Sequence, residues 1–585
     1  MCGIIAYAGK DNAVPYLVDG IRNLEYRGYD SAGCALDGGD RLIIDKDVGS
    51  VNGVIRDYNL EQLQSSRGIF HTRWATHGGV SRENAHPLSD CSGDIAVVHN
   101  GIIENWEDIK ASLKGHRFSS ETDTEVLPHL IEEGINNGLS FKDAVKSAAM
   151  KLKGSSSFVV LNRREKDMIA VKKGSPLVVG LGEKGNFVSS DVQSFLRYTN
   201  RVIYLHDNDI VVFSDSGYTV ENLLDPSIMH NVDVVELDYR SAEKGKFEHY
   251  MLKEIYEQVN LVDFFIDRNK EDIEKAASLI KKSSRVYFVG SGTSYHASLY
   301  GARLLRKLGV DAVAVQGQEL ENYDKIRKPS DVFVIISQSG ETSDIISNMN
   351  YMAGNKKIGI INVEGSNLTG AVDVLIPMGV GVEKAVAATK SFTASLVIIR
   401  LIGAYLSDSI DSTMNDLKLL KLDIYNLNVP SVIGAIEKAS DRLSNDKTII
   451  FTGAEDGFIL SLEGALKMKE VSYIHAEAFD SSAIKHGPLA LIEEGTDVIA
   501  AVTNESRDII SYGLEEMKAR GAHIIGISEE RNGRLFDEFI KSVPAKSFDF
   551  YPILMILQML AYKTAVKRGL DPDKPRNLAK SVTVK

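Results

Sequence analysis

Two stretches in the second half of the chain repeat one pattern, a short apolar strand that ends in glycine directly before a helix. They are residues 285–290, with the sequence RVYFVG, and residues 448–453, with the sequence TIIFTG. In each case a second apolar strand follows at a similar offset, at 331–335 and at 497–501. Apolar strands that alternate with amphipathic helices are typical of parallel α/β units. We therefore expect two similar parallel α/β domains in this half.

The first half of the chain has a different texture. Up to about residue 240, short β-rich runs outnumber helical patterns, which favours stacked sheets flanked by helices. The 585 residues also exceed the ~250–300 at which one hydrophobic core stops growing. We expect an α+β domain over residues 2–240, a linker over 241–274, α/β domains over 275–410 and 430–570, and a tail over 571–585. The tail should lie extended over the body; the alternative is a frayed end.

Charge and hydropathy exclude several classes of partner. The 67 basic and 80 acidic side chains give a net charge of −13 and are interspersed, so nucleic acid is not an expected partner. The most apolar stretch, 551–566, is shorter than the ~20 residues of a membrane-spanning helix, and we expect a buried helix there. No secretory signal pattern is evident, so we expect a cytoplasmic protein without a membrane partner.

The chain has three cysteines, Cys2, Cys34 and Cys91. Their spacing forms neither a CxxC pair nor a zinc knuckle, so we expect free thiols and no bound metal. Cys34 and Cys91 are interpreted as small buried side chains. Cys2 differs, because removal of Met1 would leave a thiol and a free α-amine on one residue. With a reference pKa of ~7.7–8.0 the amine is partly a free base near neutral pH, so this residue can supply both nucleophile and base.

Six short motifs, the first of them around Cys2, mark the first half. They are Cys2-Gly3-Ile4, RGYDSAG at 27–33, HTRWATHG at 71–78, NAHP at 84–87, HNG at 99–101 and ETDTE at 121–125. Together they resemble the class II glutamine amidotransferases, the N-terminal-nucleophile family, over residues 2–240. The resemblance implies an αββα sandwich that releases ammonia from glutamine.

The resemblance implies a role for each matching residue, and the chemistry agrees. Amide hydrolysis through a thioester on Cys2 needs donors for the developing oxyanion, which the Asn100 side chain and the Gly101 N–H can supply. Arg73 can hold the α-carboxylate of glutamine in a bidentate pair, and Asp123 can pair its α-ammonium group. The alternatives are a structural ion pair for Arg73 and a helix N-cap for Asp123. The expected glutamine-binding residues are Arg73, Trp74, Thr76, His77, His86 and Asp123.

Two loops in the second half have the composition of a phosphate site. They are GSGTS at 290–294 and SQSGET at 337–342, and each is expected to follow a strand and open a helix. N–H groups at helix N-termini, flanked by hydroxyls, bind phosphate without net positive charge. Neither loop reads GxxxxGK followed by Ser or Thr, nor a dinucleotide GxGxxG pattern with its acid. A small phosphorylated ligand therefore fits better than a nucleotide.

Further motifs give this half a resemblance of its own. The two loops and VAATK at 386–390 resemble the sugar isomerase domain family, and four stretches match more closely. These are LEGALKMKE at 462–470, YIHAEA at 473–478, KHGPLA at 485–490 and PRNLAKSVTV at 575–584. With the first half in front, the whole chain resembles the isomerising glutamine:fructose-6-phosphate aminotransferase family. That implies two flavodoxin-like sugar isomerase domains, glutamine and fructose 6-phosphate as substrates, no cofactor, and a homodimer or larger homo-oligomer.

The same resemblance assigns the sugar chemistry. Lys580 would form a Schiff base with the C2 carbonyl, Glu470 would move a proton between C1 and C2, and His486 of a neighbouring subunit would open the ring. Lys467, one helical turn before Glu470, would be a charge partner. Each has a plain alternative: Lys467 and Glu470 have ordinary ion-pair spacing, Lys580 could be solvated, and His486 could brace a turn. The expected sugar-phosphate residues are Gly292, Thr293, Ser294, Ser337, Gln338, Ser339, Thr342, Val386, Lys467 and Ala579.

Three departures from the family pattern bear on the substrate. Ser291 replaces a cysteine before Gly-Thr-Ser, Ala388 replaces a serine that could contact the sugar, and residues 482–483 lack the glycine and carboxylate usual before the histidine. One alternative is a related amidotransferase or a deaminase that acts on another sugar phosphate. A second is a phosphosugar-sensing regulator, which the presence of Cys2 and Lys580 disfavours.

Overall fold

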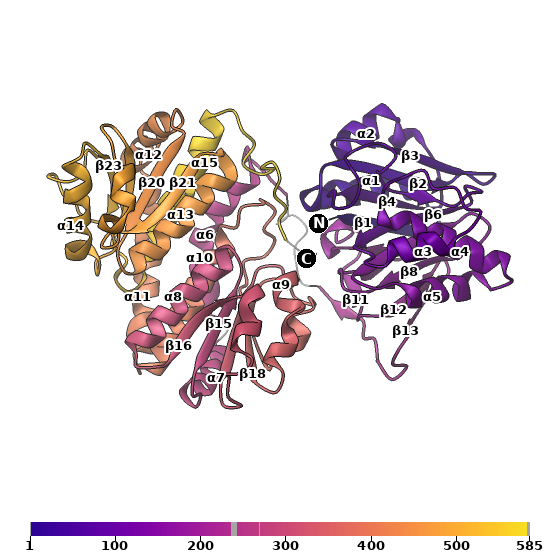
Figure 1. Cartoon of the computed structure of the whole chain (residues 1–585), viewed down its shortest axis with the longest axis horizontal. Coiled ribbons are helices and arrows are strands. Elements are labelled where there is room, and N and C mark those ends of the chain that lie inside the picture. Colours follow the sequence, from indigo (N-terminus) through magenta and orange to yellow (C-terminus); the bar gives the residue numbers. More distant parts are fainter. Residues whose placement is uncertain (1, 236–242, 268–269, 582–585) are drawn as a thin grey trace. The chain divides into compact units, whose positions relative to one another are not determined.

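The computed structural model describes residues 2–235, 243–267 and 270–581. By its internal contacts the chain forms two compact units (Figure 1). The first comprises Met1–Glu243 and Ala579–Lys585, and the second comprises Lys244–Leu578. Among the described residues, no helix has both the length and the apolarity needed to cross a bilayer.

The first unit contains two antiparallel sheets (Figure 1). The larger sheet has the order β14-β11-β9-β10-β1-β4-β2-β3, and the smaller has the order β13-β12-β8-β7-β6-β5. The strands of the larger sheet are β1 Gly3–Gly9, β2 Ser31–Asp37, β3 Leu42–Val48, β4 Arg67–Arg73, β9 Val178–Leu181, β10 Gly185–Ser189, β11 Arg201–Tyr204 and β14 Asp233–Val234. Those of the smaller are β5 Leu88–Ser89, β6 Ile95–Gly101, β7 Ser156–Asn162, β8 Met168–Lys172, β12 Asp209–Phe213 and β13 Tyr218–Asn222. The helices are α1 Ala13–Leu24, α2 Val51–Asp57, α3 Trp106–Ser112, α4 Val126–Asn136 and α5 Phe141–Lys151.

Side chains that alternate between the two faces of each strand form the layers of this unit. In β1, Ile5 and its alternate neighbour Tyr7 pack in one core with residues of α1 and α2. Ile4, on the opposite face, packs in a second core with Val98 of β6. Val97 faces the other way again, into a third core with α4 and α5. Successive strand side chains point to opposite faces, so both sheets are covered on both sides. The expected αββα sandwich is confirmed.

The second unit contains two parallel five-stranded sheets, with the orders β16-β15-β17-β18-β19 and β21-β20-β22-β23-β24. The strands of the first are β15 Val286–Gly290, β16 Ala312–Gln316, β17 Val332–Ser337, β18 Lys356–Ile361 and β19 Val374–Pro377. Those of the second are β20 Thr448–Gly453, β21 His475–Asp480, β22 Asp497–Ala501, β23 His523–Ser528 and β24 Glu538–Lys541. In chain order both sheets read 2-1-3-4-5, the flavodoxin-like arrangement. The repeat predicted from the sequence is confirmed, and its two marked strands are β15 and β20.

Helices cover both sheets and join them through one continuous core. They are α6 Tyr250–Asp267, α7 Lys270–Lys281, α8 Thr293–Lys307, α9 Ser343–Ile346, α10 Lys390–Leu406, α11 Ile410–Asp423, α12 Pro430–Leu443, α13 Asp456–Ser472, α14 Arg507–Lys518 and α15 Phe550–Lys567. Helix α15 is buried at every position from Phe550 to Tyr562, as its apolar sequence predicted.

Two segments expected to be irregular have defined partners. Residues 241–274, expected to be a linker, hold α6, and its Met251 and Ile255 side chains are buried in the core of the second unit. The Asp573 carboxylate in the tail accepts hydrogen bonds from the backbone N–H groups of Tyr250 and Met251, at 2.7 and 2.8 Å. The tail is therefore tied to the first turn of α6, while residues 582–585 lie outside the described part of the chain.

Candidate active sites

The Cys2 thiol lies directly before β1, a central strand of the first unit's larger sheet. Strand β1 pairs with β4 so that Gly3 is opposite Thr72, which brings Cys2 to the residues that follow β4. There Sγ accepts a hydrogen bond from the Trp74 N–H at 3.3 Å and lies 3.6 Å from the Trp74 carbonyl. Burial raises the pKa of the Cys2 thiol, against the lowering effects of the Trp74 N–H and the Arg73 charge. A thiol with a raised pKa needs a base before it can attack, which is the role expected for its own α-amine.

The predicted oxyanion donors lie beside this thiol. Asn100, near the end of β6, donates from Nδ2 to the Cys2 carbonyl at 3.1 Å and to Ser190 Oγ at 2.8 Å. Its Oδ1 lies 3.2 Å from Nε2 of His71. Burial lowers the pKa of His71 to about 3, so the ring is neutral, and an N–H on Nε2 orients the amide with its NH₂ group toward Cys2.

Gly101 follows in a conformation that requires glycine. Its φ is 133°, and a Cβ at this position would lie 2.0 Å from the Ser155 carbonyl oxygen. Any side chain would push β6 away from the residue preceding β7. The Gly101 N–H is thereby fixed next to the Asn100 amide.

Arg73 and Asp123 are both buried, and neither has the purely structural role considered as an alternative, which was an ion pair for Arg73 and a helix N-cap for Asp123. The Arg73 guanidinium donates to carbonyls of residues 77–79, including Gly79 at 3.2 Å and Gly78 at 3.3 Å. Among the described residues it makes no ion pair, so it anchors a loop through backbone oxygens. Asp123 does not cap a helix: it accepts from the Ile103 N–H at 2.7 Å, and Thr122 occupies the cap position.

Of the remaining predicted glutamine-binding residues, three lie in a segment that is at least partly exposed, and one is buried. Trp74 is half-buried, with its ring edge-on to Tyr29 at 5.7 Å. Thr76 is exposed and His77 is partly exposed in the irregular segment after β4. His86 instead lies inside, stacked on His71 at 4.4 Å, where burial lowers its pKa well below the ordinary value.

Sequence reasoning gave no role to His71 and His99, two buried histidines behind Asn100 that lie with His86, a predicted glutamine-binding residue. His99 Nδ1 and His86 Nε2 lie 2.7 and 3.0 Å from the same Thr124 hydroxyl, and Thr124 directly follows Asp123. Burial also lowers the pKa of His99. These neutral rings connect the strand that carries Asn100 to the turn that carries Asp123. The signal was present, because His71, His86 and His99 all lie within the quoted motifs.

In the second unit, a buried charged cluster joins the two α/β domains. Lys467 Nζ of α13 lies 2.7 Å from a Glu470 oxygen, 3.2 Å from a Glu463 oxygen, and 3.0 Å from Thr293 Oγ1 at the start of α8. Thr293 in turn donates to Glu463 at 3.0 Å. The cluster thus brings together three predicted residues, Thr293, Lys467 and Glu470. It also contains Glu463, which was not predicted.

The partners in this cluster determine its charges. Burial alone would raise the pKa of Glu463, but Lys467 and His296 outweigh it and lower that pKa. Burial alone would lower the pKa of Lys467, but Glu463 and Glu470 raise it. Lys467 is therefore a fixed cation that orients Glu470. The Glu470 side chain is 20% exposed, so it can exchange a proton with a bound ligand.

The two predicted phosphate loops differ in the length of the helix that each one opens. Gly292 has a φ of 55° and precedes the long helix α8, which begins at Thr293. The loop that begins at Ser337 opens only α9, a helix of four residues. Within it, Ser337 Oγ contacts Thr342 Oγ1 at 2.9 Å and accepts from the Gly340 N–H at 3.0 Å. The second loop is therefore held by its own hydroxyls.

Gly340 tightens this loop, and the neighbouring predicted residues lie around it. Gly340 has a φ of 63°, and a Cβ there would lie 1.8 Å from Ser366 Oγ. The Ser339 hydroxyl accepts a hydrogen bond from the Glu341 N–H at 3.1 Å. The Gln338 backbone carbonyl accepts one from the Val363 N–H at 3.2 Å. The Ser294 N–H, in the first loop, donates to the Ser291 carbonyl at 3.1 Å.

The other predicted sugar-site residues lie farther along the chain. The Val386 N–H donates to the Asp573 carbonyl at 3.4 Å, next to the tail. His486 is exposed and ends a 3₁₀ turn that starts at Ile484. Ala579 and Lys580 belong to the first unit by their contacts, and their place in the sugar site stays a prediction.

Comparison with known proteins gives one consistent result. Residues 71–197 match the glutamine amidotransferase domain, and residues 279–404 and 442–563 match the SIS domain. An isomerizing glutamine--fructose-6-phosphate aminotransferase from Pyrococcus horikoshii is 38% identical over 608 residues, covering 100% of both chains. Proteins of the same name from Thermococcus kodakarensis and Clostridium acetobutylicum are 39% and 38% identical, also over 100% of both chains.

The chain belongs to the isomerizing glutamine--fructose-6-phosphate aminotransferase family. A solved structure agrees for the second unit: the C-terminal domain of glucosamine-fructose-6-phosphate aminotransferase from Francisella tularensis is 30% identical, with a TM-score of 0.52. It covers 57% of this chain and 100% of that one. The family therefore accounts for both units of the chain, with an amidotransferase half and two sugar isomerase domains.

Proposed function

We propose that the chain converts fructose 6-phosphate and glutamine into glucosamine 6-phosphate and glutamate. The observation that carries the proposal is the presence of two separate constellations in one chain that matches its family over its full length. One is Cys2 with the Asn100 amide directed toward it, and the other is Thr293, Lys467 and Glu470 between two sugar isomerase domains.

At the first site the Cys2 thiolate attacks the carboxamide carbon of glutamine. The Asn100 amide and the Gly101 N–H bind the oxyanion, and ammonia leaves as the thioester forms. Water then hydrolyses the thioester to glutamate. Arg73 and Asp123 orient the substrate by its α-carboxylate and α-ammonium groups, and Trp74, Thr76, His77 and His86 complete the surroundings.

At the second site the phosphate rests on the hydroxyls and N–H groups of the two loops. Lys580 forms a Schiff base at C2 of the opened sugar, ammonia replaces it, and Glu470 moves the proton between C2 and C1. Water is released here and consumed at the first site, so the two steps balance. Neither step requires a metal or an organic cofactor.

We further propose a cytoplasmic homodimer in which a neighbouring subunit supplies His486 to each sugar site. The exposed position of His486 supports this assignment, since its side chain is available to a second copy. An imidazole is the side chain most often used for general acid–base proton transfer, which suits the ring-opening step.

Simultaneous measurement of both products tests the proposal. Protein freed of Met1 is mixed with glutamine and fructose 6-phosphate, and glutamate and glucosamine 6-phosphate are quantified together. Cys2→Ala should lose glutamine use, Lys580→Ala should lose amino-sugar formation, and Cys34→Ala, which removes a buried thiol away from both sites, should retain both.

A different sugar phosphate is the second candidate, favoured by Ala388, which stands where the family pattern implied by the resemblance has a serine. A panel of ketose and aldose phosphates separates the two. Glutamate without amino sugar from fructose 6-phosphate, together with turnover of another member of the panel, would replace the proposed substrate and keep the reaction class.

A further inference from the structure

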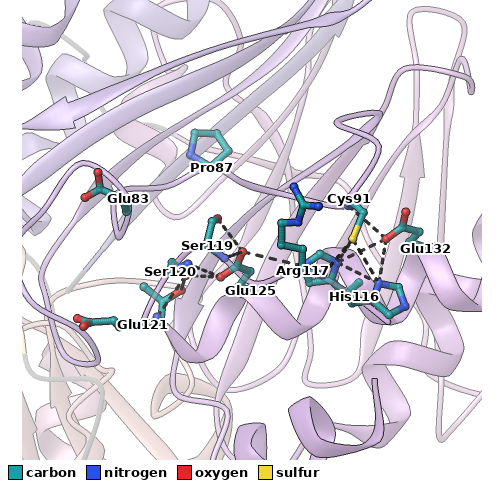
Figure 2. Close-up of polar contacts among 12 residues, drawn as sticks. Glu83, Pro87, Cys91, His116, Arg117, Ser119, Ser120, Glu121, Glu125 and Glu132 are labelled. Carbon is teal, nitrogen blue, oxygen red and sulfur yellow. Dashed lines mark hydrogen bonds and ion pairs between the residues drawn. The ribbon is translucent and has the colours of Figure 1, made fainter. Parts of the chain in front are cut away.

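Four side chains of the first unit converge at a point that belongs to neither candidate site: Cys91, His116, His129 and Glu132. One sulfur, nitrogen or oxygen atom from each lies within 4.8 Å of all the others. Cys91 precedes β6, His116 follows α3, and the other two lie one turn apart on α4. Figure 2 shows the Cys91 sulfur, the His116 ring and the Glu132 carboxylate facing one another.

Five of the six distances between these atoms are close to the edges of a tetrahedron around a zinc ion, and the sixth, between the Cys91 sulfur and the Glu132 carboxylate, lies within 4.8 Å. Bonds of ~2.0–2.1 Å to nitrogen or oxygen and ~2.3 Å to sulfur imply edges of about 3.3 Å between light atoms and about 3.6 Å to sulfur. The two Nδ1 atoms of His116 and His129 are 3.2 Å apart, and they lie 3.0 and 3.4 Å from Glu132 Oε2. Cys91 Sγ lies 3.8 and 3.7 Å from the same two nitrogens.

A shared cation also suits the close approach of the two histidine nitrogens. If both Nδ1 atoms carry hydrogens, two donors face each other at 3.2 Å. If only one does, the lone pair of the other nitrogen faces the Glu132 carboxyl group, at 3.0 or 3.4 Å. A cation at the centre removes the conflict, because all four atoms then act as ligands.

The surroundings of the cluster are those of a metal site. The Arg117 N–H donates to Cys91 Sγ at 3.3 Å, which stabilises a thiolate. Behind His129, Glu125 Oε1 lies 3.9 Å from Nε2, the nitrogen that would not bind the ion; this is close enough for a charge interaction but beyond hydrogen-bond distance. Carboxylates commonly hold the second nitrogen of a metal-binding histidine and fix its orientation. Glu125 is itself held by Ser119 and Ser120 through their N–H and hydroxyl groups (Figure 2).

We propose that Cys91, His116, His129 and Glu132 bind a structural zinc ion. On binding, the Cys91 thiol releases its proton, both imidazoles bind as neutral rings through Nδ1, and Glu132 binds as a carboxylate. Protein ligands fill all four positions, which is the pattern of structural rather than catalytic zinc. The spacing of the cysteines gave no sign of the site, because it uses a single cysteine.

The ion would fasten the segment that carries Asp123. His116 precedes the turn that contains Asp123, and the ligands His129 and Glu132 follow it on α4. A metal ion bound by all three therefore closes a loop around that turn. Loss of zinc should therefore raise KM for glutamine more than it lowers kcat. This consequence rests on the proposed function, whereas metal binding does not.

The test measures metal content on untagged full-length protein. The background is Cys2→Ala, because an accessible Cys2 thiol can also take up metal. After chelation, reconstitution with zinc and gel filtration, the parent should hold about one zinc ion per chain. Cys91→Ala should hold less than about a tenth of that, and it should fold, since Cys91 is exposed.

Cobalt(II) provides a second readout that reports on the ligand itself. The parent should show a thiolate-to-cobalt charge-transfer band, which Cys91→Ala loses and the matched Cys34→Ala keeps. Glu132→Gln should weaken cobalt affinity without removing the band. A parent that retains less than about a tenth of a zinc ion per chain, or a Cys91→Ala protein that binds as much metal as the parent, would overturn the proposal.

The KM measurement uses protein with Cys2 intact, before and after zinc removal. In the Cys2→Ala background, absence of bound zinc and of the cobalt charge-transfer band would overturn the metal site and would leave the proposed function untouched. Glutamine turnover that is absent in every sample, with the band present, would instead overturn the proposed function alone.

Discussion

Replacement of Lys467 by methionine tests the buried cluster most sharply. The Lys467 side chain is 1% exposed and Glu463 is 0% exposed, so Lys467→Met removes the lysine cation from an enclosed carboxylate and leaves His296, 2.7 Å away, as its remaining basic partner. Removal of one partner from a buried ion pair destabilises proteins by about 3–5 kcal/mol. Methionine keeps most of the lysine volume, so the loss reports charge rather than a cavity.

The shift in melting temperature follows from the size of the unit. At about 2.1 cal/mol/K per residue, the unit Lys244–Leu578 unfolds with an entropy of about 0.7 kcal/mol/K. A loss of about 3–5 kcal/mol then lowers its melting temperature by about 4–7 °C. Differential scanning calorimetry measures this on the transition of the second unit.

A matched control uses the Lys563 and Glu437 pair, whose nitrogen and oxygen are 2.7 Å apart but whose side chains are 28% and 45% exposed. Lys563→Met should cost no more than about 1 kcal/mol, because exposed pairs are screened by water. Equal shifts for both variants would refute the reasoning that burial gives the Lys467 cluster its energy.

The stability difference between Lys467→Met and the wild type should also depend on pH. In the wild type the lowered pKa of Glu463 contributes stability above about 4.3 and the raised pKa of Lys467 contributes stability below about 10.4. Without Lys467, only His296 and Thr293 oppose the effect of burial on the pKa of Glu463, so this pKa is higher than in the wild type and the folded variant takes up a proton more readily as the pH falls. Its deficit against the wild type should shrink as the pH falls towards about 4.3, the ordinary pKa of a glutamate. A constant deficit would contradict this.

Three further predictions concern other residues. Asn100→Ala should lower kcat for glutamine hydrolysis by about 100–1000-fold, because one oxyanion donor is lost; an unchanged kcat would exclude that role. The first unit should lose stability as the pH falls from about 6.5 towards 3. The reason is that His71 takes up a proton in this range when the chain is unfolded, but not when it is buried in the folded state with a pKa of about 3. Acid unfolding followed by circular dichroism measures this, and equal stability across the range would contradict it. Gly340→Ala should cost about 1–3 kcal/mol and raise KM for the sugar phosphate. Gly434→Ala, in α12 with open space around it, should leave KM unchanged and should not lower stability; equal effects would refute the steric argument.

The second unit could be largely predicted from the sequence because its signals are local. Strands β15 and β20 are each marked by an apolar run and a glycine before a helix. Helix α15 was predicted for the same reason, from one uninterrupted apolar stretch. The linker prediction missed α6, although Met251, Ile255 and Val262 already have the spacing of one helical face.

Tertiary partners could not be predicted in this way. Glu463 is buried because Thr293 and His296 approach it from another domain, and no local pattern marks such an approach. Cys34 is buried as expected, but Cys91 is exposed, so that expectation was wrong. Its surroundings depend on His116 and on α4, which lie far along the chain.

The delivery of nitrogen from one site to the other is the central claim of this account. The most direct measurement supplies glutamine labelled with ¹⁵N in its amide together with fructose 6-phosphate and an excess of unlabelled ammonium, and then determines the ¹⁵N content of the glucosamine 6-phosphate by mass spectrometry. The account predicts an amino sugar that carries the label in nearly every molecule, in equal amount to glutamate. An amino sugar with the isotope content of the bulk ammonium, or none while glutamate accumulates, would contradict it.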